Sequence, residues 1–118
     1  MKPRILSISY DQSLLLTRDL MLKQAGYEVV SCEGFADAIE HCQGHFDLII
    51  MGHSIPQKDK RAIVLELHAR GCDAPLLSLI RPGERPISEA GDTVDPFSPE
   101  LLLQKVGNML VQSEPKAN

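Results

Sequence analysis

Apolar residues in this chain form short continuous runs that alternate with longer stretches of helical spacing. Residues 48–51 are four consecutive apolar residues, which is typical of a strand buried on both faces of a parallel sheet. The runs predict strands at 5–8, 27–30, 48–51, 75–80 and 93–94, and the spaced stretches predict helices at 13–25, 35–42, 59–70 and 100–111. Asp11 or Ser13 can cap the first helix, and Gly26 stands where a left-handed stop belongs.

Strands that alternate with helices through short connections predict a parallel sheet with helices on both faces. We therefore expect a flavodoxin-like, doubly wound α/β fold with five strands, in one domain over residues 4–112, followed by a polar tail at 113–118. Ligands of such folds bind at the carboxyl ends of the strands. The loops of interest are 9–12, 52–58, 81–86 and 95–99.

The segment between the last two strands is too short for a normal crossover. Only residues 81–92 are available, and they include Pro82, Gly83, Pro86 and Gly91. Proline in a helix interior costs about 3 kcal/mol and glycine about 1 kcal/mol. We expect a helix here to be absent or vestigial, with at most one turn at 87–90 and a mobile loop that covers the sheet poorly.

Composition narrows the class of protein. The chain has 118 residues, 43% of them apolar, and a net charge of −4, which fits one folded domain and argues against a nucleic-acid binder. No apolar run is long enough for a signal peptide or a membrane span. Three widely spaced cysteines indicate reduced thiols, so we expect a cytoplasmic protein.

The order of several fragments adds a family resemblance. These fragments are AGYEVV at 25–30, FDLIIM at 46–51, Pro56, APLL at 74–77 and DPFSPELL at 95–102. Together they resemble the receiver domain of bacterial response regulators in two-component, phosphorelay signal transduction, over nearly the whole chain. The resemblance implies that the missing helix is the receiver's fourth and that the bond before Pro96 is cis.

A typical receiver holds Mg²⁺ with two acidic residues after the first strand and accepts a phosphoryl group on an aspartate after the third. A Thr or Ser follows the fourth strand and a Lys follows the fifth. By position these roles fall on Ser9 and Tyr10, Gly52, Ile80 and Asp95, none of which has the required side chain. The resemblance therefore implies a degenerate pseudo-receiver without the phosphoacceptor.

The substitutions remove each chemical step. Mg²⁺ requires hard oxygen ligands, usually carboxylates, and glycine offers no nucleophile. A negative charge at Asp95 repels a phosphate. We expect no cofactor, no Mg²⁺ and no catalytic residue, and we expect that Gly52→Asp alone does not restore phosphotransfer.

Local substitutes for the lost groups are Asp11, which is better explained as a helix cap, and His53, which follows Gly52. The basic residues Lys58, Lys60 and Arg61 are interpreted as a solvated helix face. His41, Cys42 and His45 have a spacing found in zinc sites, but a buried Cys42 beside two surface histidines is the better explanation.

Three functions remain open. The first is a receiver domain that is not phosphorylated on aspartate, is not an enzyme, and acts by protein–protein contact with a histidine kinase or regulator. The second is a phosphorelay receiver with an unorthodox acceptor. The third is a small-molecule sensor whose vacated acidic pocket holds a neutral or cationic ligand. We expect no nucleic-acid or membrane partner, and any homodimer should use a non-standard face, such as the leucine-rich first helix.

Overall fold

The computed structural model describes residues 2–113 of the chain. Five strands form one sheet: β1 (Arg4–Ser9), β2 (Glu28–Glu33), β3 (Leu48–Met51), β4 (Leu76–Leu79) and β5 (Asp92–Val94). They lie in the order β2-β1-β3-β4-β5, and all neighbouring pairs are parallel. The expected flavodoxin-like sheet is confirmed.

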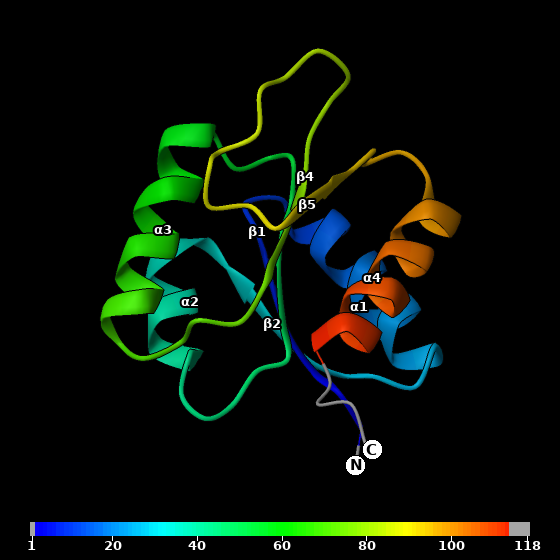
Figure 1. Ribbon diagram of the computed structural model, residues 1–118, viewed down its shortest axis with the longest axis horizontal. Coiled ribbons are helices and arrows are strands. Elements are labelled where there is room, and N and C mark those ends of the chain that lie inside the picture. The colour runs from blue at the N-terminus through cyan, green and yellow to red at the C-terminus, as the bar shows by residue number, and fades with distance from the viewer. Residues whose placement is uncertain (1, 114–118) are drawn as a thin grey trace.

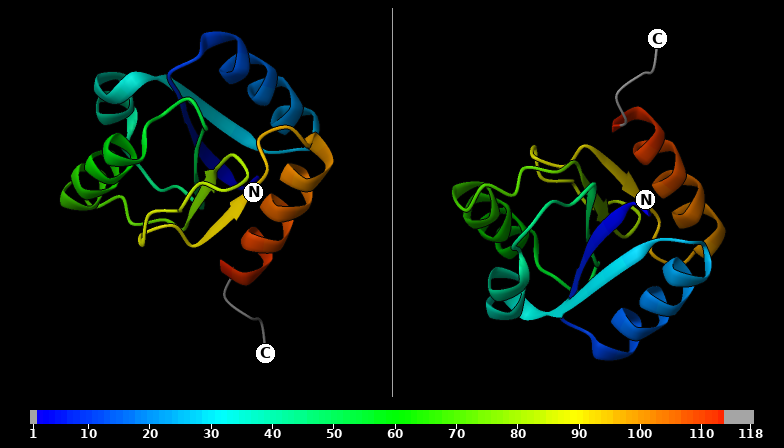
Figure 2. Two further views of the ribbon diagram at one scale, coloured as in Figure 1. Left: turned by 90° about the horizontal axis from the view of Figure 1, so that it is seen from above. Right: turned by 90° about the horizontal axis from the view of Figure 1, so that it is seen from below.

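Four helices cover the sheet: α1 (Gln12–Gln24), α2 (Gly34–His41), α3 (Gln57–Ala69) and α4 (Pro99–Ser113). Helices α2 and α3 lie on one face, and α1 and α4 lie side by side on the other (Figures 1 and 2). Helix α4 runs to Ser113, so the rest of the expected tail lies outside the described residues. No helix within residues 2–113 is long and apolar enough to cross a membrane.

The alternation of side chains along the strands builds two cores. Leu6, Ile49 and Met51 belong to the core under α2 and α3. Leu48 and Ile50 belong to the core under α1 and α4. All four residues of β3 are buried, as the continuous apolar run predicts for a central parallel strand.

The start and end of α1 follow the predicted chemistry. The Asp11 side chain accepts a hydrogen bond from Leu14 N at 3.0 Å, which confirms Asp11 as the cap. Gly26, two residues after the helix, has a φ of +99°, a conformation that side chains rarely adopt.

The connection between β4 and β5 contains no helix, as expected. It holds two isolated turns, closed by hydrogen bonds from Glu84 N to Arg81 O at 3.1 Å and from Ala90 N to Ile87 O at 3.2 Å. Gln57 Nε2 donates to Arg85 O, and Arg61 pairs with Glu89 at 3.0 Å, so α3 holds the loop on the molecule.

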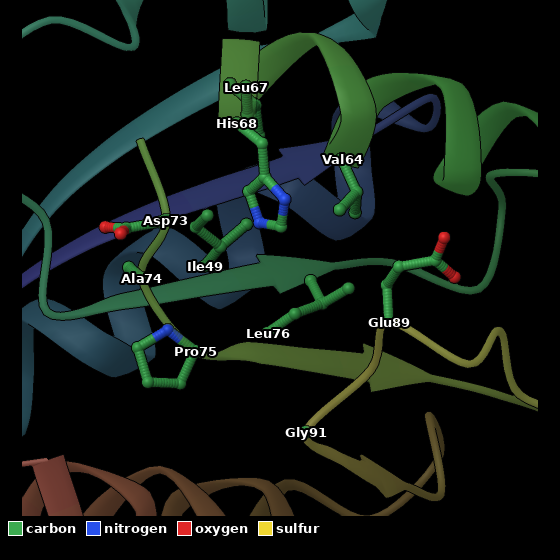
Figure 3. A pocket seen from close by; sticks show the side chains of 10 residues that line it. All are labelled: Ile49, Val64, Leu67, His68, Asp73, Ala74, Pro75, Leu76, Glu89 and Gly91. Atoms are coloured by element: carbon green, nitrogen blue, oxygen red, sulfur yellow. The ribbon is translucent and has the colours of Figure 1, made fainter. Parts of the chain in front are cut away.

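The loop covers the sheet better than the sequence predicts. Ile87 and Ala90 pack on the core under α2 and α3, and the Ile49 and Leu76 side chains beneath are only 2% and 4% exposed. A hollow of about 200 Å³ remains between α3, the start of β4 and Glu89 (Figure 3). Its apolar floor is buried, so the sheet beneath this loop offers little apolar area to a partner.

The bond before Pro96 is trans, as are all peptide bonds in the described part of the chain, so the expected cis bond is wrong. Trans is the lower-energy form of such bonds by about 0.5–1 kcal/mol. The Asp95 carboxylate accepts a hydrogen bond from Phe97 N at 2.8 Å and closes this turn without a cis bond.

Candidate functional site

The carboxyl edge of the sheet brings together two of the five degenerate positions. Ser9 ends β1 and Gly52 follows β3, and a Cβ built on Gly52 would lie 3.3 Å from Ser9 Oγ. From β1 the chain adds β2 on one side of the sheet, and from β3 it adds β4 and β5 on the other side. The strand order therefore reverses between β1 and β3, and such a switch point is where these folds bind ligands.

The other three positions face different surroundings. The Tyr10 hydroxyl donates to the Asp59 carboxylate at 3.0 Å. Partial burial, together with this hydrogen bond, raises the pKa of Tyr10. Ile80 is bonded through its backbone to Val94 at 3.1 Å. Asp95 is exposed and engaged with Phe97 N, so its side chain is held in its own turn.

Hydroxyl groups tie the two central loops together. Ser9 Oγ lies 3.1 Å from Ser54 Oγ and accepts from Asp11 N at 3.0 Å. Ser54 Oγ also accepts from Tyr10 N at 3.0 Å. The loops after β1 and β3 are therefore joined by neutral hydrogen bonds between serines.

A buried arginine from α1 lies against Gly52. Arg18 is only 5% exposed, and its Nη2 atom would lie 3.0 Å from a Cβ on Gly52. Its one hydrogen bond within residues 2–113 is a long one, from Nη1 to Ser7 Oγ at 3.4 Å. Burial lowers the pKa of Arg18 to about 10, which leaves it charged at neutral pH.

A second buried cation reaches the same edge from α3. Lys60 is 0% exposed, and its Nζ donates to Ser78 Oγ and to Leu79 O, both at 2.8 Å. Burial lowers the pKa of Lys60 to about 8, and the charge of Glu84 partly opposes that shift. The edge thus carries two internal cations where the resemblance implies acidic residues.

Sequence reasoning missed both cations, although a signal was present. Arg18 is spaced with Leu15 and Leu22, and Lys60 with Ile63 and Leu67, on the buried stripes of their helices. The interpretation of Lys60 as part of a solvated face is wrong. A charged residue at a core-facing helical position is the pattern that identifies such groups.

The two proposed substitutes have different surroundings. Asp11 is occupied as the cap of α1 and does not join the cations. His53 is half-buried, and its ring centroid lies 5.4 Å from that of Phe97. Burial, together with the charges of Arg81, Arg18 and Lys60, lowers the pKa of His53, so its ring is neutral at pH 7.

Side chains of the kinds that bind metal ions lie close together at a different place, in β2 and α2. In the part of the chain that the structure describes, the one group of three such side chains is Cys32, Asp37 and His41, whose donor atoms lie within 4.8 Å of one another. This group replaces the His41, Cys42 and His45 combination considered from spacing. Asp37 already accepts from Glu33 N and pairs with His41, both at 2.9 Å, so hydrogen bonds account for this cluster.

Comparisons with known structures identify the fold. Residues of this chain match chemotaxis protein CheY4 of Vibrio cholerae with a TM-score of 0.77 and 23% identity, covering 92% of this chain and 99% of that one. Response regulator TrrA of Thermotoga maritima, solved with Mg²⁺ and BeF, matches with a TM-score of 0.75 and 23% identity over 92% and 99%. The receiver domain of hybrid histidine kinase CckA matches with a TM-score of 0.74 and 19% identity over 91% and 98%.

No family model matches the sequence, and no curated protein does. The fold of the chain is therefore the CheY-like receiver fold, shared with signalling proteins at low sequence identity.

Proposed function

We propose that the protein is an atypical receiver domain of two-component signalling that is not phosphorylated on aspartate and acts by protein–protein contact. The observation that carries this proposal is the Arg18 guanidinium, which lies against Gly52 at the position of the missing acceptor. Aspartyl phosphate needs a carboxylate nucleophile there, and glycine has none.

The charges at the site support the proposal. Mg²⁺ is held by carboxylates in proteins, and two buried cations repel a divalent metal ion. The acids in the neighbouring loops are engaged elsewhere: Asp11 caps α1, Asp59 accepts from Tyr10, and Asp95 accepts from Phe97. This arrangement argues against a bound cofactor and against enzymatic activity.

Exposed leucines on α1 support a protein partner. Leu16 and Leu20 are 56% and 64% exposed, and their spacing places them on one side of the helix. The loop that replaces the receiver's fourth helix removes one usual contact surface, which favours a partner or a second copy on α1. The partner is a histidine kinase or another regulator, as in the hybrid kinase that carries the CckA domain.

The cysteines and the net charge indicate where the domain works. Three free, buried cysteines are consistent with a reducing cytoplasm. The net charge of −4 disfavours nucleic acid and anionic membrane surfaces as partners.

A phosphodonor assay tests the phosphorylation claim. The full chain is incubated with acetyl phosphate and MgCl₂ and its intact mass is measured, with the Thermotoga TrrA protein as positive control. We expect no phosphate on this chain and one on the control. An acyl phosphate on an aspartate of this chain overturns the claim, and an acid-labile phosphate on His53 in place of an acyl phosphate would establish the unorthodox-acceptor alternative.

A matched pair of variants tests the contact surface. We expect the double substitution Leu16→Glu and Leu20→Glu to abolish the complex that the wild-type chain forms with its protein partner or with a second copy. Lys23→Glu, at another exposed position of α1, should retain that complex. A complex that survives the leucine substitutions would exclude α1 as the contact surface.

A further inference from the structure

A small cavity opens beside Arg18 at the carboxyl edge of the sheet. Its volume is about 90 Å³, and it lies between α1 and α4. Most of its wall is apolar, with Leu14, Met21, Leu79 and Leu102 among the lining residues. The polar side chains of Arg18 and His53 line the same space.

Arg18 lacks the partner that a buried cation requires. It is 95% withdrawn from solvent, forms no salt bridge among residues 2–113, and makes a single 3.4 Å hydrogen bond. Burying a charge is costly unless an opposite charge or several hydrogen bonds compensate. Its planar fork of N–H donors is therefore available to an anion.

His53, which lines the cavity, carries a second polar group without a partner. Its Nδ1 atom is buried and has no hydrogen-bond partner in the described part of the chain. Since the ring is neutral, one of its nitrogens can donate a hydrogen bond without adding a second charge.

We propose that this cavity binds a small aliphatic monocarboxylate, with the carboxylate on Arg18 and the carbon chain against the leucines. The arginine fork matches the two oxygens of a carboxylate. The apolar wall favours a short hydrocarbon body. The inference sharpens the small-molecule alternative and corrects its ligand class, because a cation or a neutral molecule would leave Arg18 unpaired.

A phosphate fits the cavity less well than a carboxylate. A phosphate dianion needs more donors and charge than one arginine supplies, and Lys60 does not line this cavity because its Nζ is bonded to Ser78 and Leu79. The volume equals that of roughly three water molecules, which limits the ligand to about two to four carbons.

The test is a titration of the full chain with acetate, propionate and butyrate at constant ionic strength. Binding is followed by thermal unfolding and by amide chemical shifts in a carboxylate-free buffer. We expect saturable shifts near Gly52, His53 and Leu79, and a rise in Tm of about 4 °C at ~20 mM of the best ligand. Propionamide, which has the same shape without the charge, should have no effect.

Variants assign the effect to Arg18. We expect Arg18→Met to weaken propionate binding at least about tenfold and Arg18→Lys to restore part of it. Arg61→Met removes an exposed arginine and should leave binding unchanged. Thermal unfolding of each variant without ligand shows whether it is folded.

Each outcome decides the proposal. Equal effects of propionate and propionamide, equal effects of propionate and chloride, or unchanged binding in a folded Arg18→Met variant would overturn it. Stronger binding of inorganic phosphate than of propionate would overturn the carboxylate assignment. None of these results depends on phosphotransfer or a protein partner, so this inference and the proposed function fail separately.

Discussion

Lys60 and Arg18 are two buried cations at the same edge of one sheet, and their surroundings differ. Lys60 Nζ has two hydrogen bonds of 2.8 Å, to Ser78 Oγ and Leu79 O. Arg18 has one hydrogen bond of 3.4 Å and lines a cavity. Lys60 therefore links α3 to β4 through hydrogen bonds, whereas Arg18 has N–H donors that remain available to a ligand.

This difference indicates that Lys60 has a structural role and that Arg18 has a binding role. A buried charge with its hydrogen bonds satisfied resists removal, because its acceptors would be left unpaired. A buried charge without partners is costly to folding, which is the pattern of a group retained for binding. Variants at the two positions should accordingly change stability in opposite directions.

The largest expected effect comes from Lys60→Ala. The substitution leaves Ser78 Oγ and Leu79 O without their donor and opens a space beneath α3, so we expect a loss of about 3 kcal/mol in the free energy of unfolding. Urea denaturation measures this loss. Lys58→Ala, at an exposed position on the same helix, should stay within about 0.5 kcal/mol of wild type. A loss below about 1 kcal/mol for Lys60→Ala would show that the hydrogen bonds of Lys60 contribute little to the stability of the fold.

The pH dependence of stability gives the next largest effect. The folded pKa of Lys60 is about 8 and the ordinary lysine value is 10.5, so above pH 8 the unfolded chain binds more protons. The contribution of Lys60 should therefore rise by roughly 2 kcal/mol between pH 8 and 10. Burial raises the pKa of Cys32 to about 12 and opposes this trend, because the unfolded thiol ionises first.

The difference between wild type and Lys60→Met isolates the lysine from the thiol. We expect wild type to gain stability relative to Lys60→Met as the pH rises from 8 to 10. Parallel pH profiles for the two proteins would show that Lys60 is not desolvated in solution.

Arg18→Met should have a smaller effect of the opposite sign. Methionine fills similar space without a charge, so we expect the free energy of unfolding to increase by about 1 kcal/mol in a carboxylate-free buffer. Chemical denaturation at pH 7 measures the change. A destabilisation of more than about 1 kcal/mol would mean that Arg18 is as well satisfied as Lys60, and the contrast between the two cations would be lost.

Gly52→Asp should produce no phosphotransfer. The Cβ of the new aspartate would lie 3.0 Å from Arg18 Nη2, so we expect its carboxylate to pair with that guanidinium, which competes with Mg²⁺ for it. Intact mass after acetyl phosphate treatment should show no added phosphate. An added phosphate would show that the fold retains the rest of the receiver chemistry. Arg18→Met combined with Gly52→Asp tests whether the arginine is the obstacle.

Much of the fold could be predicted because short stretches of the sequence determine the individual elements. The apolar run at 48–51 identified the central strand, Asp11 identified a helix cap, and the short 81–92 segment identified the missing helix. The site was less predictable, because Arg18 is far from Gly52 along the chain and reaches it only when α1 packs on the sheet. Lys60 is likewise far from Ser78 and Leu79 in sequence and bonds them only when α3 packs beside β4. The trans bond before Pro96 was also missed, because it goes with a local turn that the Asp95 carboxylate closes by accepting from Phe97 N.

The most direct test of the account is an amide chemical-shift titration of the full chain with Mg²⁺ and beryllofluoride, a mimic of the phosphoryl group. The Thermotoga TrrA protein, whose structure contains Mg²⁺ and BeF, is the positive control. We predict no saturable shifts at Ser9, Gly52, Ile80 or Asp95 in this chain and large shifts in the control. Saturable shifts at these positions would contradict the claim that buried cations have replaced phosphoryl chemistry at this site.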